Sequence, residues 1–244
     1  MKNVQFLSNS PQIDKIINGL NLTRSLFVSS LIIGEKHTGK KTFIQMLFPD
    51  GIYVDASNKA ELNAALLSHN ELIIYNFEHV TNLDKLNFEN KRIIAIANST
   101  KETDKFHKTF AFLYKMPSLN KREDLQELIQ YFQQEIEQEL MLDSKISLDI
   151  KKLDLNQNSK SLKASIYKQL ILKTIKKEDI QLLLYNFFIK ELKGNNAYRE
   201  HLRLYEEPLI QAGLKKYKSQ LKLAGVLGLN RNTLRKKIQE YELN

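Results

Sequence analysis

The sequence contains no cysteine, which excludes disulfide bonds, cysteine-ligated zinc and thiol catalysis. It has only four prolines and eight glycines in 244 residues, so long disordered linkers are not expected. No signal peptide is expected, and no apolar run approaches the length of a membrane span. The five histidines show no spacing that suits a metal site. These absences predict a cytoplasmic chain without membrane contact.

Positive charge is present in excess and is unevenly distributed. The formal net charge is +9, and residues 194–244 hold ten Lys or Arg against five Asp or Glu, which places +5 of the excess in this segment. A localised basic region is typical of contact with nucleic acid. The excess therefore favours a nucleic acid as a partner, and the helix-turn-helix pattern of the same segment, described next, predicts that this partner is double-stranded DNA.

The basic segment has the pattern of two short helices. Residues 215–237 contain eight Lys or Arg and no acid, with apolar residues at 221, 224, 226, 227, 229, 234 and 238. We expect a first helix over 219–227 and a second that begins at Asn230, a good N-cap, with Gly228 in the turn. A solvated basic face is the alternative, but charge, cap, glycine and apolar spacing together favour a helix-turn-helix.

This segment resembles the DNA-binding domain of Fis, which the C-terminal domains of NtrC-type bacterial enhancer-binding proteins share. The similarity is carried by GLNRNTLRKKIQEYELN (228–244) and extends back through YEEPL (205–209). It implies a homodimer through a helix over 197–217. Arg231 and Asn230 would meet bases or phosphates, and the remaining contacts would be mostly to phosphates. The implied DNA-binding residues are Gln220, Asn230, Arg231, Asn232, Thr233, Arg235, Lys236 and Lys237.

A second motif lies near the N-terminus. The apolar run 26–33 leads into GEKHTGKKT (34–42), and apolar residues then continue at helical spacing. Strand, glycine-rich loop and helix is the arrangement that binds phosphates. It predicts ATP or ADP with Mg²⁺ as cofactor, although Lys41 stands where Ser or Thr normally meets the metal. A plain strand-to-helix turn with solvated lysines stays open. The candidate nucleotide-binding residues are Gly34, Thr38, Gly39, Lys40, Lys41 and Thr42.

Residues 8–175 resemble the AAA+ domain of NtrC-type proteins. Residues 34–41 are similar to its GESGTGKE loop, KRIIAIANS (91–99) to the strand that ends in the sensor asparagine, here Asn98, and PSLNKREDL (117–125) to PPLRERREDI. The resemblance implies an α/β P-loop domain, a small parallel sheet with flanking helices, followed by a helical lid and an all-α Fis-like domain.

Several positions depart from the family's pattern. Asn76 and Phe77 stand where the hydrolytic strand should end in Asp and Glu, and Glu78 would point to the other side of a strand from Phe77. Only fifteen residues separate Asp55 from Glu71, which leaves no room for the GAFTGA loop that engages the sigma factor. The family's arginines that complete the active site of a neighbouring subunit have no counterpart here. Lys108 is the nearest candidate, and a lysine lacks the planar fork that stabilises a transferring phosphoryl group. We therefore predict no catalytic residue and no metal site.

The pattern divides the chain into three predicted domains. Residues 1–125 would form the AAA+-like α/β subdomain, with strands at 31–33, 52–54, 72–75 and 93–97. Residues 126–193 would form the helical lid and connector, within a stretch (122–192) whose pattern is helical throughout. Residues 194–244 would form the Fis-type dimerisation and helix-turn-helix domain.

These features predict a sequence-specific, nucleoid-associated transcriptional regulator. Its degenerate AAA+ domain would sense nucleotide or bind a protein partner, and sigma-factor activation is not expected. Three alternatives stay open: an active AAA+ ATPase recruited to DNA, an architectural DNA-binding protein, and an interaction protein that antagonises a full-length relative by mixed dimerisation.

Overall fold

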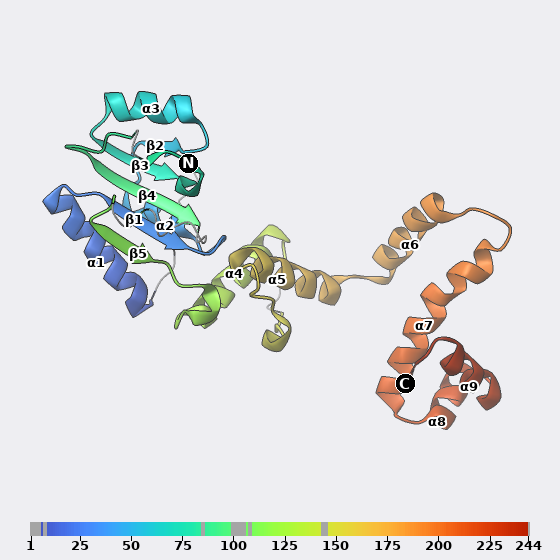
Figure 1. The fold of residues 1–244 in the computed structure, drawn as a ribbon. Helices are drawn as coiled ribbons and strands as arrows, with labels where there is room; N and C mark the ends of the chain where they lie inside the picture. Colours follow the sequence, from blue (N-terminus) through green and yellow to red (C-terminus); the bar gives the residue numbers. More distant parts are fainter. Residues whose placement is uncertain are drawn as a thin grey trace. The chain divides into compact units, whose positions relative to one another are not determined.

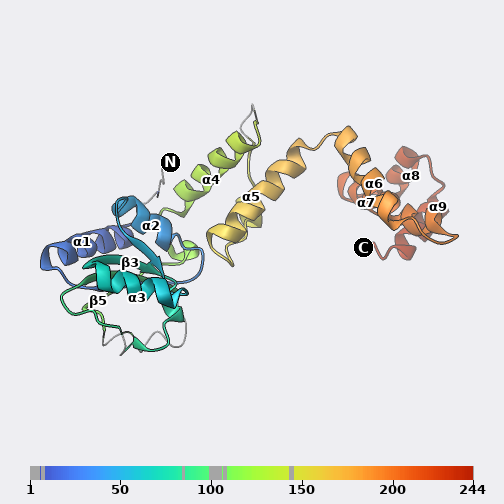
Figure 2. The same cartoon turned by 90° about the horizontal axis from the view of Figure 1, so that it is seen from above.

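The computed structural model describes residues 6, 9–83, 86–98, 106, 109–142 and 146–243. The chain forms two compact units, Met1–Thr174 and Ile175–Asn244 (Figures 1 and 2). Lys108 lies outside the described residues. No helix in the described ranges is both long and apolar enough to cross a membrane.

The first unit is built on a five-stranded parallel sheet. Its order is β2-β3-β4-β1-β5, with β1 in register with β4 and β5 on its two sides. The remaining pairs, β2 with β3 and β3 with β4, are also parallel, so all the strands end at one edge. The strands are β1 (Ser30–Gly34), β2 (Tyr53–Asp55), β3 (Glu71–Tyr75), β4 (Arg92–Asn98) and β5 (Phe112–Lys115).

The predicted α/β class and four predicted strands are confirmed, whereas β5 was missed. β5 is a short edge strand whose residues are only partly buried or exposed, so it lacks the continuous apolar run of a central strand. In contrast, β4 is buried along nearly its whole length between β3 and β1.

Helices cover both faces of the sheet (Figure 1). Helices α1 (Pro11–Leu26) and α2 (Lys40–Leu47) pack on one face, and α3 (Lys59–Ser68) packs on the other. Successive residues of β1 serve the two cores, because Leu31 joins the α3 side and Ile32 the α1 and α2 side. β1 is therefore held between two apolar layers, and the loop that follows it starts from a rigid strand.

A helix pair completes the first unit. Helices α4 (Leu125–Glu139) and α5 (Ser159–Thr174) share a core that includes Ile136 and Ile166. The expectation of helix throughout 122–192 was wrong for the described residues between α4 and α5, where a 3-10 turn, Ile150–Lys152, interrupts extended chain. The side chain of Asp149 there accepts from a backbone amide, which competes with helix formation.

The second unit is helical. It contains α6 (Lys177–Glu191), α7 (Ala197–Tyr217), α8 (Gln220–Leu227) and α9 (Arg231–Glu240). The last three share a core that includes Ile210, Leu223 and Leu234. Helix α6 belongs to this compact unit. The predicted division into three domains, with boundaries at 125/126 and 193/194, stays a prediction.

Candidate functional site

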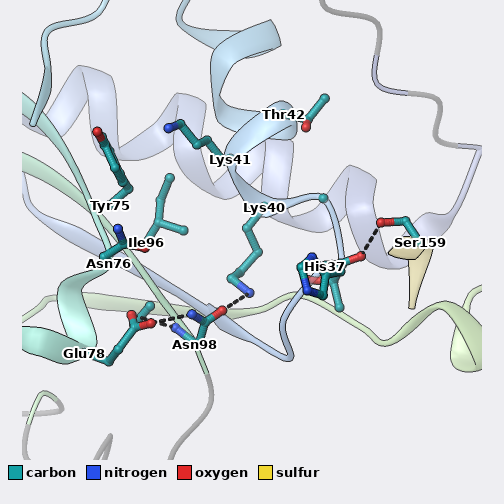
Figure 3. Close-up of a pocket in the computed structure, with 13 residues that line it drawn as sticks. His37, Lys40, Lys41, Thr42, Tyr75, Asn76, Glu78, Ile96, Asn98 and Ser159 are labelled. Carbon is teal, nitrogen blue, oxygen red and sulfur yellow. Dashed lines mark hydrogen bonds between the residues drawn. The ribbon is translucent and has the colours of Figure 1, made fainter. Parts of the chain in front are cut away.

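The glycine-rich loop joins the end of β1 to the start of α2. Gly34 passes close to the chain after β5, since a Cβ there would lie 2.8 Å from the carbonyl oxygen of Met116. Gly39 caps α2 with φ of 88°, a conformation that only glycine adopts without strain. The loop and the strand ends line a pocket of about 290 Å³ that contains Thr38, Lys40, Lys41 and Thr42 (Figure 3).

Lys40 is the buried cation of this pocket, with 6% of its surface exposed. Its ammonium donates to the carbonyl oxygens of Gly34 (2.9 Å) and Glu35 (2.6 Å) and to Oδ1 of Asn98 (3.2 Å). Burial lowers the pKa of Lys40 to about 8, against the opposing charges of Glu78 and Glu35. Lys40 and the loop fit a phosphate group. A phosphate would give the desolvated ammonium of Lys40 a charged partner in place of the neutral carbonyl oxygens of Gly34 and Glu35.

Glu78 lies in the same pocket, contrary to the expectation from strand alternation. β3 ends at Tyr75, Asn76 takes φ of 55°, and a 3-10 turn, Phe77–His79, follows. The turn buries Phe77 in the core and directs Glu78 to Asn98, whose backbone N–H donates at 3.0 Å and whose amide also donates (Figure 3). Strand alternation does not apply here, so a carboxylate is present beside Lys40 and Asn98 after all.

A second lysine of the pocket, Lys41, adds positive charge at the position whose side chain would meet a nucleotide-bound metal. Lys41 points to Tyr75, with its ammonium 3.8 Å from the ring centroid, while Thr42 lies on another side of the start of α2 (Figure 3). Beside them, the Asn76 amide donates to both carboxylate oxygens of Asp55 at 3.1 Å. Partial burial works to raise the pKa of Asp55, but hydrogen bonds from Ser57 and Asn76 and the charge of Lys41 outweigh it and lower that pKa.

A metal site is not supported by this arrangement. Among the described residues, no group of three or more His, Asp or Glu side chains could hold a metal ion. The two positions that would face a nucleotide-bound Mg²⁺ are an ammonium, Lys41, and an amide, Asn76, that is already bound to Asp55. The residues therefore fit polyphosphate but do not fit a divalent cation.

The start of α5 touches the loop, and sequence reasoning missed it as part of the site. The backbone N–H and hydroxyl of Ser159 donate to the carbonyl of His37 at 3.1 and 2.7 Å. Asn158, with φ of 52°, donates to Lys36 O and to the Glu35 carboxylate, both at 3.0 Å, and accepts from the backbone N–H of Leu119. These contacts tie the conformation of the loop to the α4–α5 pair.

The C-terminal site is the turn between α8 and α9. Gly228 ends α8 with φ of 65°, and Oδ1 of Asn230 accepts from the N–H of Asn232 at 2.8 Å. Both predicted caps are therefore present. Leu234 and Ile238 are buried beneath α9, whereas Leu221 and Val226, which were expected on the apolar face, are exposed.

The outer surface of α9 brings several predicted DNA-binding residues together. Gln220, Arg231, Asn232 and Arg235 line one shallow surface depression. Thr233 and Lys236 are exposed on the same short helix. Asn230 lies at its start, where its side chain is used in capping.

Lys237 differs from the other predicted DNA contacts. Its ammonium lies 2.7 and 2.6 Å from the two carboxylate oxygens of Glu206 on α7. The hydroxyl of Tyr241 donates to the same carboxylate. Partial burial works to raise the pKa of Glu206. The hydrogen bonds from Lys237 and Tyr241 and the positive charge of Lys237 outweigh it, so the pKa of Glu206 is lowered. Lys237 thus joins α9 to α7 in this structure.

Residues 201–241 match the family of bacterial regulatory proteins of the Fis family. The helix-turn-helix of α8 and α9 thus lies within the segment that matches the Fis family, and it follows a parallel α/β domain whose fold has counterparts among solved structures. No match was found among curated protein sequences.

Solved structures show similar folds at low sequence identity. NtrX from Brucella abortus is 16% identical, with a TM-score of 0.50 over 97% of this chain and 69% of that one. NtrX in complex with ATP is 14% identical, with a TM-score of 0.49 over 98% and 70% of the two chains. AMPPCP-bound DnaA from Aquifex aeolicus is 13% identical, with a TM-score of 0.45 over 98% and 89%.

Proposed function

We propose that this protein is a sequence-specific DNA-binding regulator of transcription, acting on the nucleoid in the cytoplasm. The observation that carries the proposal is the exposed surface formed by Gln220, Arg231, Asn232 and Arg235 at the start of α8 and α9. Arginine at the start of a second helix can read guanine edges in the major groove, and the neighbouring side chains can hold phosphates. We assign Lys237 to stabilising α9 instead of to DNA, because Glu206 binds it.

DNA binding by the variants Arg231→Ala and Arg235→Ala tests this role. Each loss should cost about 1–3 kcal/mol of binding free energy if the arginine reads a base. A lost phosphate contact should instead reduce the slope of log K against log salt by about one. Arg24→Ala, which removes an exposed arginine from α1, is the matched control and should change neither quantity. Unchanged affinity of the double variant at moderate salt would exclude the proposed surface.

The same unit supports a homodimer. α7 exposes Leu204, Tyr205 and Leu209, and α6 exposes a larger apolar set comprising Leu182, Leu183, Leu184, Tyr185, Phe187 and Ile189. Contiguous exposed apolar side chains favour association with a partner surface. A second copy fits because paired helix-turn-helix units read half-sites about one helical turn apart. Sedimentation analysis should show a dimer that Leu204→Glu weakens, and a monomeric wild type at micromolar concentration would refute it.

We further propose that the AAA+-like domain senses ATP or ADP and biases DNA binding. Support comes from Lys40, a desolvated cation at the start of α2 that faces the pocket. A saturable rise in melting temperature with nucleotide should disappear in Lys40→Ala and persist in Lys36→Ala, which changes an exposed lysine of the same loop. No shift at millimolar nucleotide would leave the domain as a scaffold or a docking site for a protein.

An active ATPase is the second candidate, and Glu78 is the observation that favours it. Its carboxylate is connected through Asn98 to Lys40, so the pocket contains an acid that could orient water. Steady-state hydrolysis that both Lys40→Ala and Glu78→Gln abolish would establish this candidate. Activation of the sigma factor is not proposed, because α3 occupies most of the short segment between β2 and β3.

A further inference from the structure

Lys41 is the residue of the pocket that the proposed nucleotide sensing does not explain. It is exposed at the start of α2, directly after the buried Lys40, and its ammonium lies over the ring of Tyr75. The same wall contains Asn76 (Figure 3). Asn76, Glu78 and Asn98 also line the pocket, at the carboxyl ends of the neighbouring strands β3 and β4.

The position of Lys41 matters for metal binding. In the pattern GxxxxGK[ST], the residue after the lysine offers a hydroxyl to Mg²⁺, and an acid at a neighbouring strand end supports the ion. The GESGTGKE loop that residues 34–41 resemble has a glutamate at this position, so an ammonium departs from both patterns. Mg²⁺ requires nearly octahedral oxygen ligands at about 2.0–2.1 Å. An ammonium has no lone pair to offer and repels the ion.

The nearby oxygen atoms do not replace the missing ligands. Both oxygens of Asp55 accept from the Asn76 amide, and one also accepts from the N–H of Ser57. Both oxygens of Glu78 accept from Asn98, one from its backbone N–H and one from its side-chain amide. Among the described residues that line the pocket, two lysine ammonium groups are therefore offered to an anion and a single carboxylate, that of Glu78, to a cation.

We propose that this pocket binds the polyphosphate of a nucleotide free of divalent metal, with the ammonium of Lys41 in the place of Mg²⁺. The proposal rests on the proposed nucleotide sensing and makes it more specific. A lysine supplies a positive charge but no oxygen ligand for a metal ion. The Mg²⁺ of a metal–nucleotide complex is therefore repelled by the ammonium of Lys41. Metal-free nucleotide carries more negative charge than its metal complex and is therefore attracted more strongly by the two lysines.

Isothermal titration of the full chain with ATP, in EDTA and in excess Mg²⁺, tests the proposal. We expect the dissociation constant in EDTA to be lower by about tenfold, which corresponds to about 1.4 kcal/mol. Lys41→Thr restores a hydroxyl and should reverse the preference. Lys41→Met removes the charge without adding an oxygen, so it should weaken binding in EDTA and leave no gain in Mg²⁺. Lys36→Met is the matched control and should behave as the wild type.

The outcomes separate this inference from the function on which it rests. Tighter binding of the Mg²⁺ complex by the wild type, or a preference that Lys41→Thr leaves unchanged, would overturn the role of Lys41 and leave nucleotide sensing intact. Binding in neither buffer would overturn both. Binding that Lys40→Ala does not reduce would place the nucleotide outside the pocket and would also overturn the inference.

Discussion

The contact between Glu206 and Lys237 should determine how firmly α9 is held on α7. The Glu206 carboxylate accepts from Lys237 through both oxygens and from the Tyr241 hydroxyl. The side chains of Lys237 and Glu206 are only 22% and 19% exposed. An exposed ion pair contributes about 0–1 kcal/mol, and breaking a fully buried one costs about 3–5 kcal/mol. For this partly buried set we expect Glu206→Gln to cost about 2 kcal/mol.

Hydrogen–deuterium exchange of the amides of α9 in the full chain measures this cost. A loss of about 2 kcal/mol corresponds to roughly a 30-fold rise in the opening constant of the helix. Glu207→Gln is the matched control, because Glu207 lies beside Glu206 on α7 and pairs with Arg203 in an i,i+4 contact on the surface of the helix. Such a pair contributes about 0.3–0.5 kcal/mol. Equal effects of the two glutamine variants would refute the reasoning.

The same contact makes a prediction about pH. The pKa of Glu206 is lowered in the folded chain from its ordinary 4.5. Its contribution to stability is therefore fully present above pH 4.5 and is lost as the pH falls through the lower folded value. The gap in thermal stability between wild type and Glu206→Gln should be constant from about pH 7 to about pH 5 and should narrow in stronger acid. A gap that widens in acid would contradict this assignment.

Three further outcomes are expected. Nucleotide binding should weaken as the pH rises through about 8, because Lys40 of the unbound protein has a pKa of about 8 and above it must take up a proton before it can bind a phosphate. The affinity of Lys40→Met for nucleotide, measured over the same pH range, should show no such decrease. Asn158→Ala should destabilise the first unit by about 2–3 kcal/mol in thermal unfolding, since it leaves the N–H of Leu119 unpaired, and Asn158→Gly should be milder because it tolerates φ of 52°. Gly228→Ala should cost about 1–2 kcal/mol through φ of 65° alone, as nothing lies within 4 Å of the new Cβ, whereas Gly225→Ala in α8 should be neutral or stabilising by calorimetry.

The helix-turn-helix was predictable because its determinants are local. Gly228 and Asn230 act on the residues next to them, and the apolar spacing that buries Leu234 and Ile238 lies within one helix. The central strands were predictable for a similar reason, since a strand covered on both faces is a continuous apolar run. The edge strand β5 and the described residues 146–155 before α5 have weaker local patterns, and their conformation depends on the core against which they pack.

The acidic wall of the pocket could not be predicted from spacing, because it depends on one backbone conformation. Asn76 takes φ of 55°, which ends β3 and turns the chain so that Phe77 enters the core and Glu78 enters the pocket. The amide of Asn76 donates to both oxygens of Asp55. An ionised aspartate at this position would have no hydrogen to donate and would repel Asp55. The replacement of the expected acid at 76 and the presence of an acid at 78 are therefore parts of one local arrangement. Strand alternation alone predicts that the pocket loses an acid when Asn76 replaces aspartate, but the turn that follows Asn76 supplies the carboxylate of Glu78.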